Sequence, residues 1–543
     1  MLVILLLSCG AGNAPDFPSE DDSTPAEDTI GERLFLDTRF AQYFAEHMTA
    51  VNQPVAVGDP VVAVVQSPNG PLAGPFAGQS INCRSCHFVT EFQNVASAAN
   101  RTYADFTTRS PIPRPLGGFT ATPRNAKQMV GSLQPHSGPL LLHLDGEFAS
   151  PAELVQATLT GRNFGWAPEQ FQQAVAHIAL VIREDDGSSQ LAQDRTAGYS
   201  YRALFLGTDP TIPSDLRIPA QDRIDVNQAP DQQVLALVAK CISTYMADLL
   251  FQQDEFGRYI GSPYDVFLRI NHLPVQLNAG ETSIQYSRRL LTILEGLQSP
   301  EWVDGTLGSF RYHNQPFSFG PTELAGLKIF LRAAAVSDAS QHAGNCASCH
   351  PAPDFSDFAF HNTGVSQEEY DAVHGTGSFL RLVIPSLSER NSNYDLYLPQ
   401  TLTHPSASER FRRAADPTNP GFADLGMWNV YLNPDMPAPQ AALQGFVCSA
   451  GQNCSIDLGL PNTIAQFRTP TLRDLEDSAP YFHNGSKPRF SDVVTFYIES
   501  SALARQGLLR NAPPEFNKMS LSNDDVEALV AFLRALTEDY DDT

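Results

Sequence analysis

Apolar residues recur at helical spacing along much of the chain. Residues 234–250 carry this pattern without Gly or Pro, and residues 287–297 repeat it. Residues 522–536 begin with a serine and two aspartates, which suit a helix N-terminus. Strand signals are short and scattered, and 41 prolines lie largely between the helical segments. The pattern predicts a mainly α fold in which residues 184–230 and 351–466 form long ordered loops with short helices.

The same order of segments occurs twice along the chain. The apolar segments 31–36 and 326–331 each precede a C-x-x-C-H pattern, and after each pattern a Thr-Pro segment leads to a turn and an amphipathic stretch. A repeat of this length is too long for a solenoid unit. It predicts two related domains, residues 31–315 and residues 316–543, that arose by duplication.

The C-x-x-C-H patterns carry the clearest chemistry, because this pattern is the attachment site of c-type haem. Two thiols three residues apart can each add to one vinyl group of a porphyrin, and the next residue places an imidazole under the iron. A zinc site would need a second ligand pair near each pattern, and a redox dithiol would need a βαβ context; the sequence has neither. It therefore predicts two covalently bound haem c groups, one on Cys83, Cys86 and His87 and the other on Cys346, Cys349 and His350.

The net charge of the chain limits the classes of partner that it can bind. The 543 residues carry a formal net charge of -25. Such a surface repels nucleic acid, so a nucleic-acid partner is excluded. The acidity suits a basic partner such as a small electron-carrier protein, and it equally serves solubility.

The N-terminal segment indicates export. Residues 1–9 resemble the end of a bacterial signal peptide with a lipobox, in which Cys9 is lipidated, and their apolar run is too short to cross a bilayer. Residues 10–30 are rich in Pro, Ser, Asp and Glu, which predicts a flexible tether. Because c-type haem is attached outside the bacterial cytoplasm, we expect a periplasmic lipoprotein anchored to the membrane through Cys9.

Three further cysteines have structural interpretations. Cys448 and Cys454 lie close together in a loop-like stretch, and in an oxidising compartment they are expected to form a short-loop disulfide. Cys241 lies in an apolar helical run and is expected to be a buried free thiol.

Several segments together carry a family resemblance. They read F-R-T-P-T-L-R at 467–473, A-P-Y-F-H-N-G at 479–485, F-H-N-T-G-V at 360–365 and R-L-F-L-D at 33–37. From about Ile30 to Leu536 the chain resembles the bacterial di-haem cytochrome c peroxidase and MauG family. The resemblance implies two cytochrome-c-like domains, with hydrogen peroxide reacting at the N-terminal haem and electrons passing through the C-terminal haem.

The resemblance also points to the sixth ligand of the second haem. In the peroxidases this ligand is a methionine fourteen residues after the His of the P-Y-F-H motif, and here that position is Tyr497, as in MauG. A phenolate is hard and anionic, so it favours oxidised iron more than a thioether does. Alternatively, Tyr497 packs on a helix and Met519 is the ligand; Met427 and Met436 are weaker candidates.

The first haem is expected to have an open face. The His that closes this face in several peroxidases aligns near Gly117, and no histidine lies between His87 and His136. The inter-haem Trp of the family is replaced by Leu144, so direct tunnelling or another aromatic such as Trp166 would have to serve. The distal glutamate has no clear match.

Glu147 and Glu169 lie near the position of the missing distal glutamate in the sequence. A glutamate in such a place is more often a solvated helix residue, so neither is assigned a role.

The family resemblance further implies a calcium ion between the two domains. Its ligands, one Asn side chain and two backbone carbonyls, map onto Asn125, Ser478 and Pro480. Oxygen ligands of this kind suit a hard cation. Because Asn125 belongs to one repeat and Ser478 to the other, calcium would fix the geometry between the haems.

These observations predict an exported di-haem oxidoreductase that uses hydrogen peroxide. Its partner would be a small cytochrome or cupredoxin that donates electrons, or a protein whose side chains it oxidises, as in MauG. The alternative is a di-haem electron-transfer cytochrome without peroxide turnover.

Overall fold

The computed structural model describes residues 25–67, 70–73, 79–87, 111–116, 119–311, 313–335, 341–448, 456–476 and 478–539. The predicted lipidation of Cys9, the position near Gly117 and the disulfide partner Cys454 lie outside these residues. Cys448 itself is disulfide-bonded. In the part of the chain described, no helix is both long enough and apolar enough to cross a membrane.

Helices dominate the described residues, which confirms the mainly α prediction. The longer helices are α1 (Ala26–Leu36), α4 (Pro151–Leu159), α5 (Phe171–Glu184), α8 (Asp231–Asp248), α10 (Ser283–Gly296), α11 (Pro321–Leu331), α12 (Val365–His374), α18 (Phe490–Arg505) and α19 (Val526–Arg534). The shorter helices are α2 (Gln42–His47), α3 (Pro60–Ala63), α6 (Gln190–Thr196), α7 (Tyr201–Leu206), α9 (Pro263–Ile270), α13 (Ser378–Arg381), α14 (Leu387–Ser392), α15 (Tyr394–Tyr397), α16 (Gln440–Val447) and α17 (Ile456–Asn462). The strands form antiparallel pairs, β1 (Val64–Ser67) with β2 (Gly70–Ala73), β3 (Pro111–Leu116) with β4 (Phe119–Ala121), and β5 (Phe360–His361) with β6 (Phe467–Arg468).

The helical patterns in the sequence correspond to real helices. The apolar segment 234–250 lies within and just after α8, and the segment 287–297 lies mostly in α10. At the start of the last helix, the Ser522 backbone N–H donates to the Asp525 carboxylate at 2.8 Å. This cap satisfies a backbone donor that has no partner in the helix, so the helix begins where the serine and aspartates predicted.

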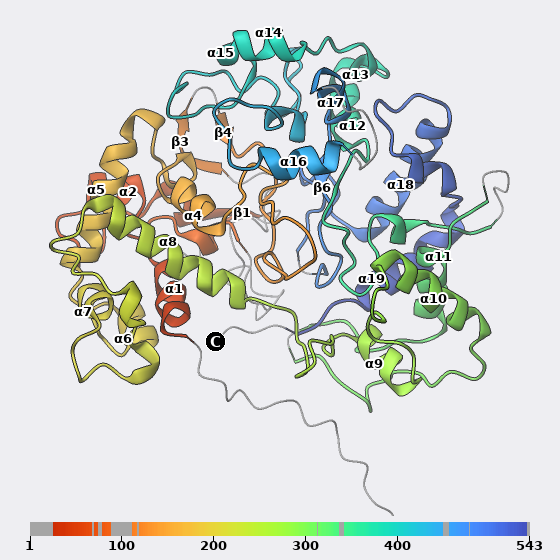
Figure 1. Ribbon diagram of the computed structural model, residues 1–543, viewed down its shortest axis with the longest axis horizontal. Coiled ribbons are helices and arrows are strands. Elements are labelled where there is room, and N and C mark those ends of the chain that lie inside the picture. The colour runs from red at the N-terminus through yellow and green to blue at the C-terminus, as the bar shows by residue number, and fades with distance from the viewer. Residues whose placement is uncertain are drawn as a thin grey trace, which may run out of the picture.

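Three large clusters of buried side chains organise the molecule. The first joins α1, α4, α5 and α8, which lie on the left of Figure 1, and the second joins α9, α10, α11 and α19, which lie on the right. The third cluster lies under the loops and short helices α12–α17 at the top. Helices α9 and α10 precede the predicted domain boundary at residue 315, yet they pack in the second cluster.

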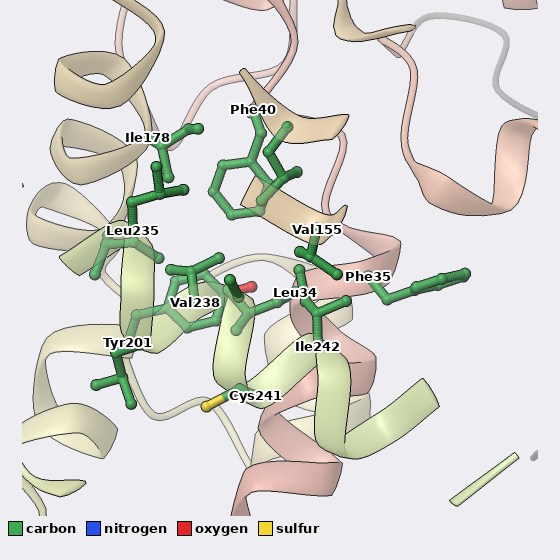
Figure 2. Packing of buried hydrophobic residues seen from close by; sticks show 14 of the residues in the cluster. Leu34, Phe35, Phe40, Val155, Ile178, Tyr201, Leu235, Val238, Cys241 and Ile242 are labelled. Atoms are coloured by element: carbon green, nitrogen blue, oxygen red, sulfur yellow. The ribbon is translucent and has the colours of Figure 1, made fainter. Parts of the chain in front are cut away.

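The first cluster is centred on the crossing of α1 with α8. Figure 2 shows Leu34, Val238 and Ile242 packed together there, and Cys241 is fully buried and free, as predicted. A Cβ atom at Gly31 would stand 2.0 Å from the backbone oxygen of Cys241. Glycine is therefore required at this point for the two helices to approach each other.

Helices α11 and α19 in the second cluster also cross at a glycine. A Cβ atom at Gly326 would stand 1.9 Å from the backbone oxygen of Ala528. In each case the C-x-x-C-H pattern follows the helix that carries the glycine. The paired helices thus hold the chain that leads into each pattern.

Candidate functional site

Both C-x-x-C-H patterns lie in single turns of 3-10 helix, η1 (Cys83–Ser85) and η8 (Cys346–Ser348). In η1 the side chain of Asn82 accepts a hydrogen bond from the Ser85 backbone at 3.0 Å. None of the four cysteines of the patterns forms a disulfide bond. Burial and the neighbouring thiol raise the pKa of Cys83 and of Cys346 to about 12. All four are therefore available as thiols for covalent attachment.

The two histidines of the patterns are oriented in the same way. His87 Nδ1 lies 2.8 Å from the backbone oxygen of Lys127, and His350 Nδ1 lies 2.9 Å from that of Phe355. A carbonyl oxygen only accepts, so Nδ1 must donate and Nε2 is left to bind a metal. Burial lowers the pKa of both imidazoles, which favours the neutral form that a metal requires.

One cavity of about 780 Å³ joins the two patterns. Its lining includes every residue predicted to hold haem, namely Cys83, Cys86, His87, Cys346, Cys349, His350 and Tyr497. The sequence separates the two patterns by more than 250 residues, and the fold brings them to one space. We call this space the haem cavity.

The wall of the haem cavity contains two cations that fit the propionate groups of haem. Lys127 and Arg468 both line the cavity, and neither has a carboxylate partner among the described residues. Burial lowers the pKa of Lys127 to about 7 and that of Arg468 to about 10. A buried cation without an anion is costly, and the carboxylates of a bound haem would remove that cost.

Tyr497 lies on α18 in an aromatic part of the cavity wall. Its ring contacts Phe482, Phe496 and Phe516 at centroid distances of 6.0, 5.7 and 6.0 Å. No hydrogen bond to its hydroxyl is found within the described residues. Burial raises the pKa of Tyr497, and the thiols of Cys349 and Cys346 add to this effect. The hydroxyl is thus near the second pattern and has no competing protein partner in this part of the chain.

The structure reduces the number of methionines that could be the sixth ligand of the second haem. Met519 lines the haem cavity and packs in one small cluster with Tyr497. Met427 is fully buried in the third cluster, and Met436 packs against that cluster; neither lines the cavity. Tyr497 and Met519 remain the two predicted candidates.

The residues predicted to act near the first pattern differ in whether they line the cavity. Leu144 and Trp166 both line the cavity, but the Trp166 indole N–H donates to the Phe40 backbone oxygen at 3.2 Å. Glu147 lines the cavity, whereas Glu169 is exposed and is absent from the described lining. Glu147 is held by Arg412, and the guanidinium keeps the pKa of that carboxyl well below its usual range despite burial.

Several cavity residues escaped the sequence argument. His143 lines the cavity next to Glu147, and Glu409 and Arg412 reach it from the third cluster. Only the segment H-L-D-G-E around His143 carried a signal, because it occupies the place of F-H-N-G in the second repeat. Glu409 and Arg412 lie in a long loop without a recognisable pattern, so nothing in the sequence marked them.

The residues predicted to bind calcium lie together. The Asn125 side-chain amide contacts the Pro480 carbonyl oxygen at 2.5 Å, and Asn125, Ser478 and Pro480 all line the cavity. The Asn125 backbone also donates to the His483 oxygen at 2.7 Å. Two segments far apart in the sequence therefore meet at this point, and the calcium ion itself stays a prediction.

Comparisons with known proteins agree with these motifs. No protein-family profile matches the chain. Cytochrome-c peroxidase IdrP2 of Denitromonas iodatirespirans is 28% identical over 194 residues, which are 36% of this chain and 36% of that protein. Methylamine utilization protein MauG of Methylophilus methylotrophus is 37% identical over 70 residues, 13% of this chain and 19% of that protein. These relatives support the resemblance of the chain to the di-haem cytochrome c peroxidase and MauG family.

The matched segments of these relatives are partial. The chain spans about a third of the length of IdrP2 and about a fifth of that of MauG. Two solved structures are also similar to this chain. A MauG-like protein associated with microbial copper homeostasis has a TM-score of 0.43 and 15% identity, covering 97% of this chain and 93% of that one. The diheme peroxidase BthA from Burkholderia thailandensis E264 has a TM-score of 0.40 and 16% identity, covering 95% of this chain and 86% of that one.

Proposed function

We propose that this protein is an exported di-haem c-type oxidoreductase that reacts with hydrogen peroxide at the site of His87. Oxidising equivalents then pass through the site of His350. The observation that carries the proposal is the haem cavity, which brings both C-x-x-C-H patterns to one space with their Nε2 atoms left for a metal.

Each residue of the site has a defined role in this proposal. The four thiols form thioether bonds to haem, and His87 and His350 are the proximal ligands. Tyr497 is the sixth ligand at the second site. Lys127 and Arg468 bind haem carboxylates. The bound haems supply the redox chemistry, and the protein fixes their position and the charge around them.

The two haem sites would have different roles. Tyr497 lies in the aromatic wall near Cys349, so its phenol oxygen could bind the iron of a haem held there, and a bound phenolate would favour oxidised iron. The first site faces the polar wall that contains Glu147 and Arg412. A polar wall can bind and orient a peroxide, whereas an aromatic wall cannot.

We also propose the organisation and location of the chain. The repeated glycine crossings support two cytochrome-c-like haem domains related by duplication. The covalent haem patterns support export to the periplasmic side, with a lipid anchor at Cys9. The reducing partner would be a small cytochrome or cupredoxin, and the alternative partner is a protein whose side chains are oxidised.

A calcium ion at Asn125, Ser478 and Pro480 is part of the proposal. The contact of Asn125 with the Pro480 carbonyl joins the two repeats and supports an oxygen-ligated cation at that point. Removing divalent cations with a chelator should lower peroxidase activity before the protein unfolds. Equal activity in protein shown by elemental analysis to be free of metal other than iron would exclude the ion.

The deciding experiment adds one equivalent of hydrogen peroxide to the oxidised protein carrying both haems and records the absorption spectrum. We expect a new haem spectrum that a reductant returns to the starting one. Bleaching, or an unchanged spectrum, would instead support a di-haem electron-transfer cytochrome without peroxide turnover. The resting spectrum provides a second check, because one haem should be high-spin and the other low-spin.

A further inference from the structure

A short hairpin at residues 142–148 places two chemically matched side chains on the wall of the haem cavity. Leu142 and Phe148 pair through backbone hydrogen bonds of 2.7 and 3.4 Å. His143 has a φ of 60°, in the left-handed region, where side chains other than glycine are uncommon. The result is that His143 and Glu147 meet, with Nδ1 of the imidazole 2.9 Å from Oε2 of the carboxylate. Such strain is often found where a side chain must be aimed.

The carboxylate of this pair is fixed by a guanidinium. Arg412 donates to both oxygens of Glu147, and it also donates to Asp145 at 2.9 Å. Arg124 binds the same Asp145 from the other side at 2.6 Å. Glu147 therefore stays ionised, and an ionised carboxylate only accepts hydrogen bonds.

This charge arrangement sets the tautomer of His143. Because Glu147 accepts, Nδ1 of His143 must carry the proton, and Nε2 is then the basic nitrogen of the neutral ring. His143 lines the cavity, its side chain is 40% exposed, and no partner of Nε2 is found within the described residues. After the larger effect of burial, a charge on His143 also lowers the pKa of His87, so the two rings lie in electrostatic contact.

The other polar groups on this wall are less suited to move a proton. Both oxygens of Glu409 are taken by the guanidinium of Arg162, at 3.0 and 3.3 Å. The Trp166 indole N–H is committed to a backbone oxygen. Lys127 is assigned to the haem carboxylates, so among Glu409, Trp166 and His143, the histidine is the one with a basic atom left over.

We propose that His143 is the general acid–base residue for peroxide at the first haem, oriented by Glu147 and Arg412. This inference rests on the proposed function. Nε2 takes the proton from one peroxide oxygen and returns it to the other, which leaves as water when the O–O bond breaks. The two electrons that reduce the remaining oxygen come from the haem pair. The missing distal glutamate of the family is thus replaced by a histidine from a different segment.

The test compares variants of the protein that carries both haems. His143→Gln keeps a polar side chain of similar size but has no basic nitrogen. We expect its second-order rate with hydrogen peroxide to fall on the order of 10²- to 10⁴-fold, with the resting haem spectrum unchanged. His47→Gln is the matched control, because His47 is exposed on α2 and lies away from the cavity lining. Its rate should equal that of the wild type.

Glu147→Gln tests the positioning role separately. The glutamine amide can donate to Nδ1 and hold the other tautomer, so the rate should fall and its dependence on pH should differ from that of the wild type. The charged groups around the ring are Glu147, Arg412, Asp145 and Arg124.

Three outcomes decide the matter. An unchanged rate in His143→Gln overturns the role of His143 and leaves the proposed function in place. A change of the resting spectrum of that variant from low-spin to high-spin also overturns it, because His143 would then be an axial ligand. A wild-type protein that carries two haems and does not react with peroxide refutes the proposed function itself, and the role of His143 with it.

Discussion

The two ends of the haem cavity are built alike but lined differently. Each has a glycine crossing of two helices, a single 3-10 turn with two thiols, and a histidine that faces a backbone carbonyl through Nδ1. The wall near the first pattern is ionic, with Glu147, Arg412 and Asp145 in one network. The wall near the second is aromatic around Tyr497.

This difference shows how one scaffold can support two kinds of haem chemistry. Ion pairs fix the protonation state and direction of nearby polar groups, which proton transfer to a substrate requires. Aromatic packing surrounds Tyr497, and its hydroxyl lies near the thiols of Cys346 and Cys349. In the proposed function the scaffold would hold both haems, and the two walls would give each haem its role.

The largest expected effect comes from removing one pair of thiols. Replacing Cys346 and Cys349 together by Ala should leave one covalent haem per chain instead of two, because no thioether can form at the second site. The pyridine haemochrome spectrum and the intact mass measure this number. Cys241→Ala is the control and should keep both haems, since that thiol is buried away from the cavity lining. Two covalent haems in the double variant would exclude the second site.

A smaller effect is expected from removing the hydroxyl of Tyr497, which should change the spectrum of one haem and leave the other unchanged. Tyr497→Phe removes the phenol oxygen and keeps the ring, so the absorption and EPR spectra of one ferric haem should change while the other stays the same. Met519→Leu is the matched variant and should leave both spectra unaltered. The reverse result would assign the ligand to Met519 and remove the proposed contrast between the two sites.

The smallest effect concerns the feature that the two halves share. Gly31→Ala and Gly326→Ala each place a methyl group against a backbone oxygen, so each should lower the free energy of unfolding by about 1–3 kcal/mol. Gly296→Ala, at the end of α10 with nothing within 4 Å of the new methyl group, is the control and should not destabilise. Denaturant midpoints of the protein with both haems would measure these shifts. A neutral result at either crossing would show that the helices can separate there without cost.

Much of the fold was predictable because its signals are local. Apolar spacing predicted α8, α10 and α19. The same holds for the haem attachment residues, since both thiols and the histidine lie within five consecutive positions. Local geometry and covalent chemistry depend little on the rest of the chain.

The remaining features depend on contacts between distant segments. Arg412 reaches Glu147 across 265 positions, and Arg124 reaches Asp424 across 300. No periodicity or motif encodes such pairs, because a long loop can place a side chain in many directions until the core beneath it is packed. The sequence by itself determined the two C-x-x-C-H patterns, which predict haem attachment, and a mainly helical fold. Only the tertiary structure decided that the two sites share one cavity and that His143 and its ion pairs line it.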